Sequence, residues 1–112
     1  MNSTKTFNDL TFEQDTDYPH EKLNQPPKYN ATFTANGYTV SVIYGGGSYS
    51  ANRTYEVAVF SPEEGVIPLD EFDTVLGWRT KQEITKIMKV VQLRPDLLKP
   101  RTIAQIFDEA DV

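Results

Sequence analysis

The chain has 112 residues, no cysteine, and 16 acidic against 11 basic side chains, which gives a net charge of −5. This length fits one domain with a modest core. The composition excludes disulfides and thiolate chemistry. The net acidity argues against direct nucleic-acid binding, which needs a basic surface, and no apolar run reaches the roughly 18 residues that span a membrane.

Residues 1–27 are acidic and sustain neither the strand period nor the helix period. We therefore predict an irregular N-terminal arm at 1–27, extended at Pro26–Pro27, followed by a single α+β domain at 28–112. The arm lacks the apolar stretch of a signal peptide, so we expect a cytoplasmic protein. Its apolar residues are too many for a free tail, so some should pack on the domain or on a partner; the alternative is a loosely ordered terminus. These residues are Phe7, Leu10, Phe12 and Tyr18.

Two alternating runs, "KYNATFTA" and "YTVSVIY", flank Asn36-Gly37 and predict an antiparallel hairpin with a type I′ turn. A third strand is predicted in "RTYEVAVF". A short fourth strand is predicted in "VIPL", where Pro68 would confine it to an edge. The sequence thus predicts a small antiparallel meander of three to four strands between residues 28 and 69. The inward residues would be Tyr29, Ala31, Phe33 and Ala35 on the first strand, Tyr38, Val40, Val42 and Tyr44 on the second, and Tyr55, Val57 and Val59 on the third.

One C-terminal amphipathic helix is predicted to pack on this meander. Thr80 and Glu83 form a capping box, and the apolar stripe ends just before Pro95, so the helix should run from about 80 to 93. A short final helix is predicted near Thr102. The stripe contains Ile84, Ile87, Met88 and Val91, with Lys81, Lys86 and Lys89 on the opposite side.

Trp78 is the only tryptophan and lies two residues before the predicted helix cap. From that place it could staple the chain onto the helix or the sheet, and we expect it in the core. The alternative is an exposed anchor for a partner, because tryptophan is enriched at binding hot spots.

Charge is segregated along the chain. Residues 79–101 hold seven bases and two acids, net +5, whereas five acids crowd the segment just before the helix. Solvated faces are one explanation, and a dipolar surface that orients encounters with a partner is the other. The five acids are Glu63, Glu64, Asp70, Glu71 and Asp73.

The stretch "YGGGSYSANR" joins the second and third predicted strands. It is neither a Walker loop nor a dinucleotide fingerprint. Three interpretations stay open: a hairpin loop with no ligand, a protein-contact loop, or a site for a nucleotide or other anion formed by glycine amides. With Trp78 added, the candidate ligand- or partner-binding residues are Tyr44, Gly45, Gly46, Gly47, Tyr49, Arg53 and Trp78.

No catalytic or metal-binding set is recognisable in the sequence. His20, the single histidine, stands in the arm without a nearby acid or cysteine pattern, and no base can be assigned to any serine. The acidic "LDEFD" lacks the glycine hinge and final glutamate of a calcium loop. We therefore predict a protein that is not an enzyme, with no cofactor and no metal.

The stretch from Tyr38 to Leu93 resembles a group of short proteins of unknown function from tailed bacteriophages. The matching features are "YTVSVIYGGGSY", "YEVAVF" and "VLGWRTKQEITKIM". They supply an alternating strand, a Gly-rich turn with an aromatic, an "EVA" strand, a Gly-Trp pair and a helix opened by threonine. The resemblance covers about half the chain and implies a phage origin and an antiparallel sheet closed by a helix, with no catalytic residue to carry over.

Two function classes follow. The first is a phage-type accessory protein that binds and inhibits or modulates a host bacterial protein, such as a component of a defence system, in the host cytosol. The second is a small-ligand binder that captures a nucleotide or other anionic signal through the Gly45–Gly47 loop. Sequence leaves open whether the chain is a monomer or a homodimer.

Overall fold

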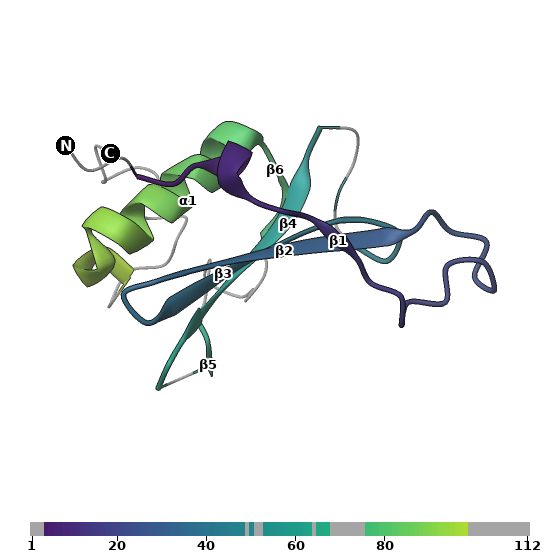
Figure 1. The fold of residues 1–112 in the computed structure, drawn as a ribbon, viewed down its shortest axis with the longest axis horizontal. Coiled ribbons are helices and arrows are strands. Elements are labelled where there is room, and N and C mark those ends of the chain that lie inside the picture. The colour runs from purple at the N-terminus through teal and green to yellow at the C-terminus, as the bar shows by residue number, and fades with distance from the viewer. Residues whose placement is uncertain (1–3, 49, 51–52, 64, 68–75, 99–112) are drawn as a thin grey trace.

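The protein has a small α+β fold in which one helix lies on one face of an antiparallel sheet (Figure 1). This computed structural model describes residues 4–48, 50, 53–63, 65–67 and 76–98. The elements are η1 (Phe7–Asp9), β1 (Glu13–Gln14), β2 (Lys28–Ala35), β3 (Tyr38–Gly45), β4 (Tyr55–Ser61), β5 (Gly65–Val66), β6 (Leu76–Arg79), α1 (Lys81–Leu93) and η2 (Pro95–Leu98).

The hairpin of β2 and β3 forms as predicted. Asn36 and Gly37 both have positive φ, 52° and 83°, which is the backbone that a type I′ turn requires. The Asn36 side chain donates to the carbonyl oxygens of Val91 and Gln92 at 2.9 and 3.1 Å. The turn that sets the strand register therefore also holds the end of α1.

The sheet register places the predicted inward residues opposite one another. Tyr29 pairs with Tyr44 and Phe33 with Val40 between β2 and β3. Val40 and Val42 pair with Val59 and Val57 between β3 and β4. Because side chains alternate along a strand, these pairs lie on one face and confirm the predicted apolar face of the meander.

Helix α1 covers the valine end of that face. Ile84, Ile87, Met88 and Val91 are buried as predicted, together with Val90. The helix stripe, the four central valines of the sheet and Leu97 and Leu98 of η2 belong to one hydrophobic core. Helix α1 ends at Leu93, just before Pro95.

The N-terminal arm crosses the same face and joins the core. Phe7, Leu10 and Phe12 pack against it, which confirms that the apolar groups of the arm fold back on the domain. The Phe7 amide donates to Thr85 Oγ1 of α1 at 3.0 Å. The arm also adds the two-residue strand β1 beside β2 through the register Glu13 to Asn30, so backbone pairing fixes the arm at this point of its path.

The strand count differs from the prediction. Within the described residues the sheet has six strands; β1-β2-β3-β4-β5 are neighbours in that order, and β6 also pairs with β4. Strand β5 is only two residues long and shares Val66 with the predicted fourth strand, whose last two residues lie outside the described part of the chain. Strands β1 and β6 were not predicted, because both are short and neither alternates. The predicted helix near Thr102 and the residue Pro68 lie outside the described residues.

Within the described residues, no helix is long and apolar enough to cross a membrane.

The buried stripe of α1 can be tested by one charge. Ile87 is 1% exposed, so Ile87→Asp should destabilise the domain by several kcal/mol, because a carboxylate would lose water without gaining a partner. Leu93→Asp is the control, since Leu93 is on the same helix but 54% exposed. Thermal melting should show a large decrease in melting temperature for Ile87→Asp and a small decrease for Leu93→Asp. An unchanged melting temperature for Ile87→Asp would show that the stripe is not core.

Candidate functional site

The three consecutive glycines make room for the end of the arm. A Cβ at Gly45 would overlap the carbonyl oxygen of Pro27, and a Cβ at Gly46 would overlap that of Pro26. A Cβ at Gly47 would lie 2.8 Å from the Tyr18 ring. Gly45 and Gly47 also have φ values of 101° and 76°, which other residues rarely adopt. The glycines therefore permit close backbone packing of the arm against the loop.

Two of the three glycine amides are already engaged. The Gly46 amide donates to the Pro27 carbonyl oxygen at 3.3 Å, and the Gly45 amide donates to Ser50 Oγ at 3.2 Å. A nest of open amides, which was one of the three interpretations of this loop, would have to rely on Gly47, which is exposed. A side chain at Gly46 would lower stability, because Gly46 is buried against the arm.

A chain of hydroxyl groups closes the loop from inside. Ser48 Oγ donates to the Gly45 carbonyl oxygen at 2.7 Å. Its proton is then used, so in the 2.7 Å contact between Ser48 Oγ and Ser50 Oγ the donor is Ser50. Each serine hydroxyl thus donates once within the loop. This network ties Gly45, Ser48 and Ser50 together within the loop.

A cavity of about 500 Å³ lies beside the loop and gathers three of the predicted site residues, Tyr44, Gly45 and Arg53. Arg53 has a φ of 66°, so its backbone is held in the left-handed region. Sequence reasoning missed two further lining residues, Tyr55 and Lys81. Tyr55 was assigned to the core face and Lys81 to a solvated helix face, and only the meeting of β4 with the start of α1 brings them together. The described lining is completed by Pro26, Ser50 and Thr54.

Three other predicted site residues, Gly46, Gly47 and Trp78, are not among the described residues that line this cavity. Gly46 and Gly47 contact Tyr18 of the arm instead of lining this cavity. Tyr49 lies outside the described residues. Trp78 belongs to β6.

Aromatic rings form the wall behind the cavity. Tyr44 stacks on Tyr29, with centroids 5.0 Å apart and planes at 18°, and meets Tyr55 edge to face at 5.7 Å. Tyr55 also contacts Phe7 at 4.8 Å. Burial raises the pKa of Tyr55, and the neighbouring Tyr44 raises it further. The Tyr55 hydroxyl therefore stays protonated at neutral pH and remains a hydrogen-bond donor.

Trp78 is 60% exposed, so the expectation that it belongs to the core is wrong. The register from Tyr55–Arg79 to Val57–Leu76 is irregular: Gly77 and Trp78 stand opposite Glu56 alone. This extra residue makes a bulge, and a bulge re-aims the side chain that it carries. Trp78 takes a φ of 53°, a conformation that costs a bulky residue roughly 1–3 kcal/mol.

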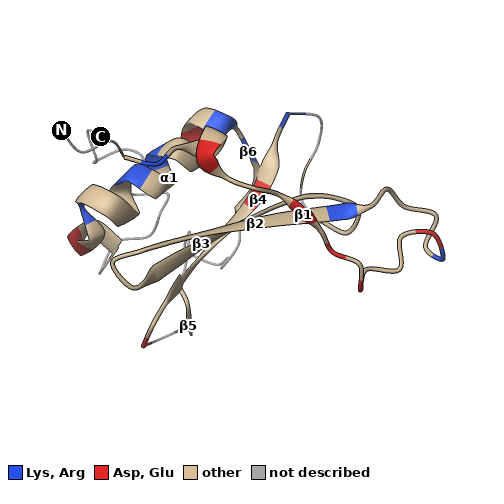
Figure 2. Ribbon diagram, viewed as in Figure 1, with Lys and Arg blue, Asp and Glu red and all other residues tan. Residues whose placement is uncertain are grey.

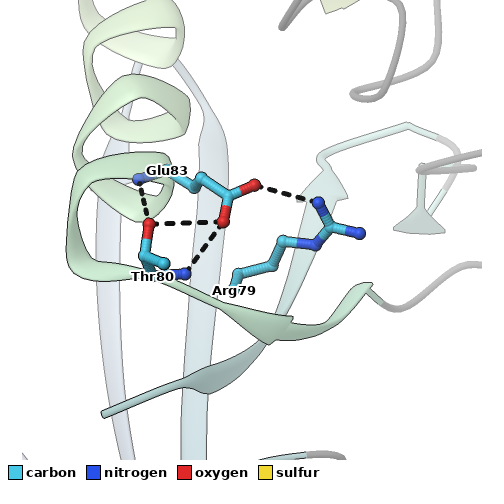
Figure 3. A network of polar contacts seen from close by, with 3 residues as sticks. All are labelled: Arg79, Thr80 and Glu83. Carbon is cyan, nitrogen blue, oxygen red and sulfur yellow. Dashed lines mark hydrogen bonds and ion pairs between the residues drawn. The ribbon is translucent and has the colours of Figure 1, made fainter.

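The junction of β6 and α1 is tied by the predicted capping box (Figure 3). Thr80 Oγ1 accepts from the Glu83 amide at 3.2 Å, and Glu83 Oε1 accepts from the Thr80 amide at 3.0 Å. Arg79 Nη1 binds Glu83 Oε2 at 2.9 Å. Burial raises the pKa of Glu83, but the hydrogen bonds from Thr80 and Arg79 and the Arg79 charge outweigh it, so the pKa lies below the usual 4.5.

Several basic residues lie along α1, as the blue segments of its ribbon show (Figure 2). Lys81, Lys86 and Lys89 line a second hollow of about 450 Å³ between α1 and the arm, together with Phe7, Asn8, Gln82 and Thr85. Lys81 lines both hollows, and its Nζ lies 5.4 Å from the centroid of the Phe7 ring. The predicted basic face of the helix is thus continuous with the cavity beside the glycine loop.

Among the described residues, no three His, Cys, Asp or Glu side chains lie close enough together to hold a metal ion. The "LDEFD" segment, with Asp70, Glu71 and Asp73, lies outside those residues. His20 is partly buried in the arm, where its amide donates to the Tyr18 carbonyl oxygen at 2.8 Å.

Comparison of the chain with protein-family models, with curated proteins and with solved structures gives no match.

The packing role of the glycines can be measured with a matched pair. Gly47 and Gly65 share a φ of 76°, but a Cβ at Gly65 meets nothing within 4 Å. Both Gly→Ala variants should therefore lose stability from backbone strain, and Gly47→Ala should lose about 1–3 kcal/mol more from overlap with Tyr18. Denaturant unfolding gives the difference. Adding Tyr18→Ala should remove much of this excess; equal losses at the two glycines would contradict the packing role.

The Glu83 network predicts a pH dependence. A carboxyl whose pKa is lowered by folding stabilises the protein above its unfolded-state pKa, and the contribution is lost as pH falls through the lower folded-state value. Glu83→Gln should thus cost about 1 kcal/mol at pH 7, the size of a capping interaction, and less at pH 3. Urea unfolding at both pH values checks this, with the exposed Glu63→Gln as control. A cost that does not depend on pH would contradict the network.

Proposed function

We propose that this chain is a non-enzymatic accessory protein of the tailed-phage type that binds and inhibits or modulates a host bacterial protein, such as a defence component, in the host cytosol. The observation that carries the proposal is Trp78, a large aromatic side chain that is 60% exposed on a strained backbone.

Trp78 combines a strained backbone with a largely exposed side chain. For a buried tryptophan, the free energy of apolar burial would offset the cost of the strained backbone. The Trp78 side chain instead remains largely in water. Strained residues persist only where the surroundings hold them, and they cluster at functional sites. Tryptophan is also the residue type most enriched at binding hot spots. An interface anchor accounts for the strain, the exposure and the residue type together.

Electrostatics support a protein partner. The chain carries a net charge of −5, yet α1 carries three basic residues, Lys81 beside the β6 junction and Lys86 and Lys89 further along the helix. Segregated charge of this kind accelerates and orients association with a surface of complementary pattern. The absence of a recognisable catalytic set in the sequence supports a binding role over catalysis.

A second candidate function is capture of a small anionic ligand, such as a nucleotide. The observation that favours it is the cavity in which Tyr44, Gly45 and Arg53 meet Lys81. This candidate requires no protein partner.

The protein-binding proposal is tested by replacing the anchor. Trp78→Asn removes the ring with a residue that tolerates positive φ, and Leu93→Asn removes an apolar side chain of similar exposure, 54%, from the end of α1. The wild type and both variants are used to capture proteins from bacterial lysate, and the affinity of any captured protein is then measured. Trp78→Asn should weaken binding at least tenfold, as expected for a hot spot, and Leu93→Asn should not. Equal capture by all three proteins would contradict the role of Trp78.

A further inference from the structure

We propose that the cavity beside the glycine loop is a binding site for a small molecule that carries a phosphate monoester, with Arg53 and Lys81 as its cationic contacts. This inference rests on the second candidate function and is independent of the protein-binding proposal.

The charge of the cavity is the first argument. The chain has 16 acidic residues, but no acid is among the described residues that line this cavity, whereas Arg53 and Lys81 both are. Neither cation takes part in an ion pair within the described part of the chain. A phosphate monoester carries close to two negative charges at neutral pH, so it would balance these two side chains. Arginine supplies paired N–H donors for phosphate, and lysine acts as a point charge.

The two cations are positioned by the fold. Arg53 is held at a φ of 66°, in a region that non-glycine residues occupy only when the surrounding structure imposes it. Lys81 is the first residue of α1, directly after the Thr80 cap, and its ammonium group lies over the Phe7 ring. A cation over an aromatic face is stabilised by the ring quadrupole. The backbones of Arg53 and Lys81 are therefore fixed beside the cavity before any ligand arrives.

The neutral wall adds hydrogen-bond donors. Tyr44 and Tyr55 line the cavity, and neither hydroxyl has a hydrogen-bond partner among the described residues. Because Tyr55 keeps its proton at neutral pH, it can donate to an oxyanion. The Ser50 hydroxyl already donates its hydrogen bond to Ser48 Oγ. The donors on which this proposal relies are therefore the two tyrosine hydroxyls and the two cationic side chains.

The size of the cavity sets the ligand class. Its volume of about 500 Å³ lies within the range of about 300–1,000 Å³ that is typical of small-molecule sites. A free phosphate ion would leave most of that space to water. The phosphate is therefore expected on a carrier the size of a nucleoside or a sugar.

The test uses calorimetry on the full chain with adenosine 5′-monophosphate and glucose 6-phosphate as probes. Adenosine and glucose serve as matched probes without phosphate. At least one phosphorylated probe should bind, and its dephosphorylated form should bind at least tenfold more weakly. Binding of neither phosphorylated probe, or equal binding with and without phosphate, would overturn the proposal.

The variants locate the site. Arg53→Asn removes the guanidinium with a residue suited to positive φ, and Lys81→Gln removes the ammonium from an exposed helix position. Each substitution should lower the affinity for the phosphorylated probe about tenfold or more, which is the effect of losing a charged hydrogen bond. Lys89→Gln is the matched control, because Lys89 lines only the neighbouring hollow. If Lys89→Gln weakens the probe as much as Lys81→Gln does, binding reflects overall charge and the site is overturned.

One further comparison separates the two proposals. Trp78→Asn should leave phosphate binding unchanged, because Trp78 is not among the residues that line the cavity. Arg53→Asn should leave capture of a protein partner by Trp78 unchanged, because Arg53 lines the cavity and is not among the helix cations invoked for that partner. Loss of phosphate binding in Trp78→Asn would overturn the cavity as a separate site.

Discussion

The apolar face of the sheet is longer than helix α1 can cover, and the rest of the structure follows from this constraint. Strands β2 and β3 have eight residues each, and α1 has 13, which gives the helix a length of roughly 20 Å. The helix covers the central valines. The aromatic end of the same face, with Tyr29, Tyr44 and Tyr55, is covered instead by Phe7 and Phe12 of the N-terminal arm. The arm is thus part of the core.

The path of the arm explains the glycine loop. To enter β2 after crossing the face, the chain must pass close to the end of β3, and it does so with the carbonyl groups of Pro26 and Pro27 against Gly45 and Gly46. Any side chain at those positions would push the arm away. The cavity arises at the same place, because the loop, the start of β4 and the first turn of α1 meet there without filling the space between them. The three glycines, which suggest a ligand-binding loop in the sequence, serve first to let the arm pack closely against the loop. The charged and hydroxyl side chains that could bind a ligand lie beside them.

The pairing of β6 with the start of β4 shows a second place where the backbone is strained. Strand β6 joins β4 through a bulge at Gly77 and Trp78, and the chain then passes at once into the Thr80 cap of α1. Arg79 is fixed on one side by its ion pair with Glu83, so the bulge has little freedom to relax. The capping network that begins the helix thereby also holds Trp78 in its exposed position. Helix stability and the presentation of this side chain are coupled through three consecutive residues.

The sequence by itself determined the elements whose signals are local. Asn36-Gly37 defined the hairpin, because few residues accept positive φ at both turn positions, and the Thr80–Glu83 spacing with its apolar stripe defined the helix. Only the tertiary structure decided what depends on contacts between distant segments. Strand β6 has four residues with a glycine and no alternation, so it exists because β4 offers a partner. The exposure of Trp78 follows from that bulge, and the meeting of Arg53 with Lys81 follows from packing α1 beside β4. Local spacing cannot encode these results, because they arise from residues that are far apart in the chain and adjacent only after folding.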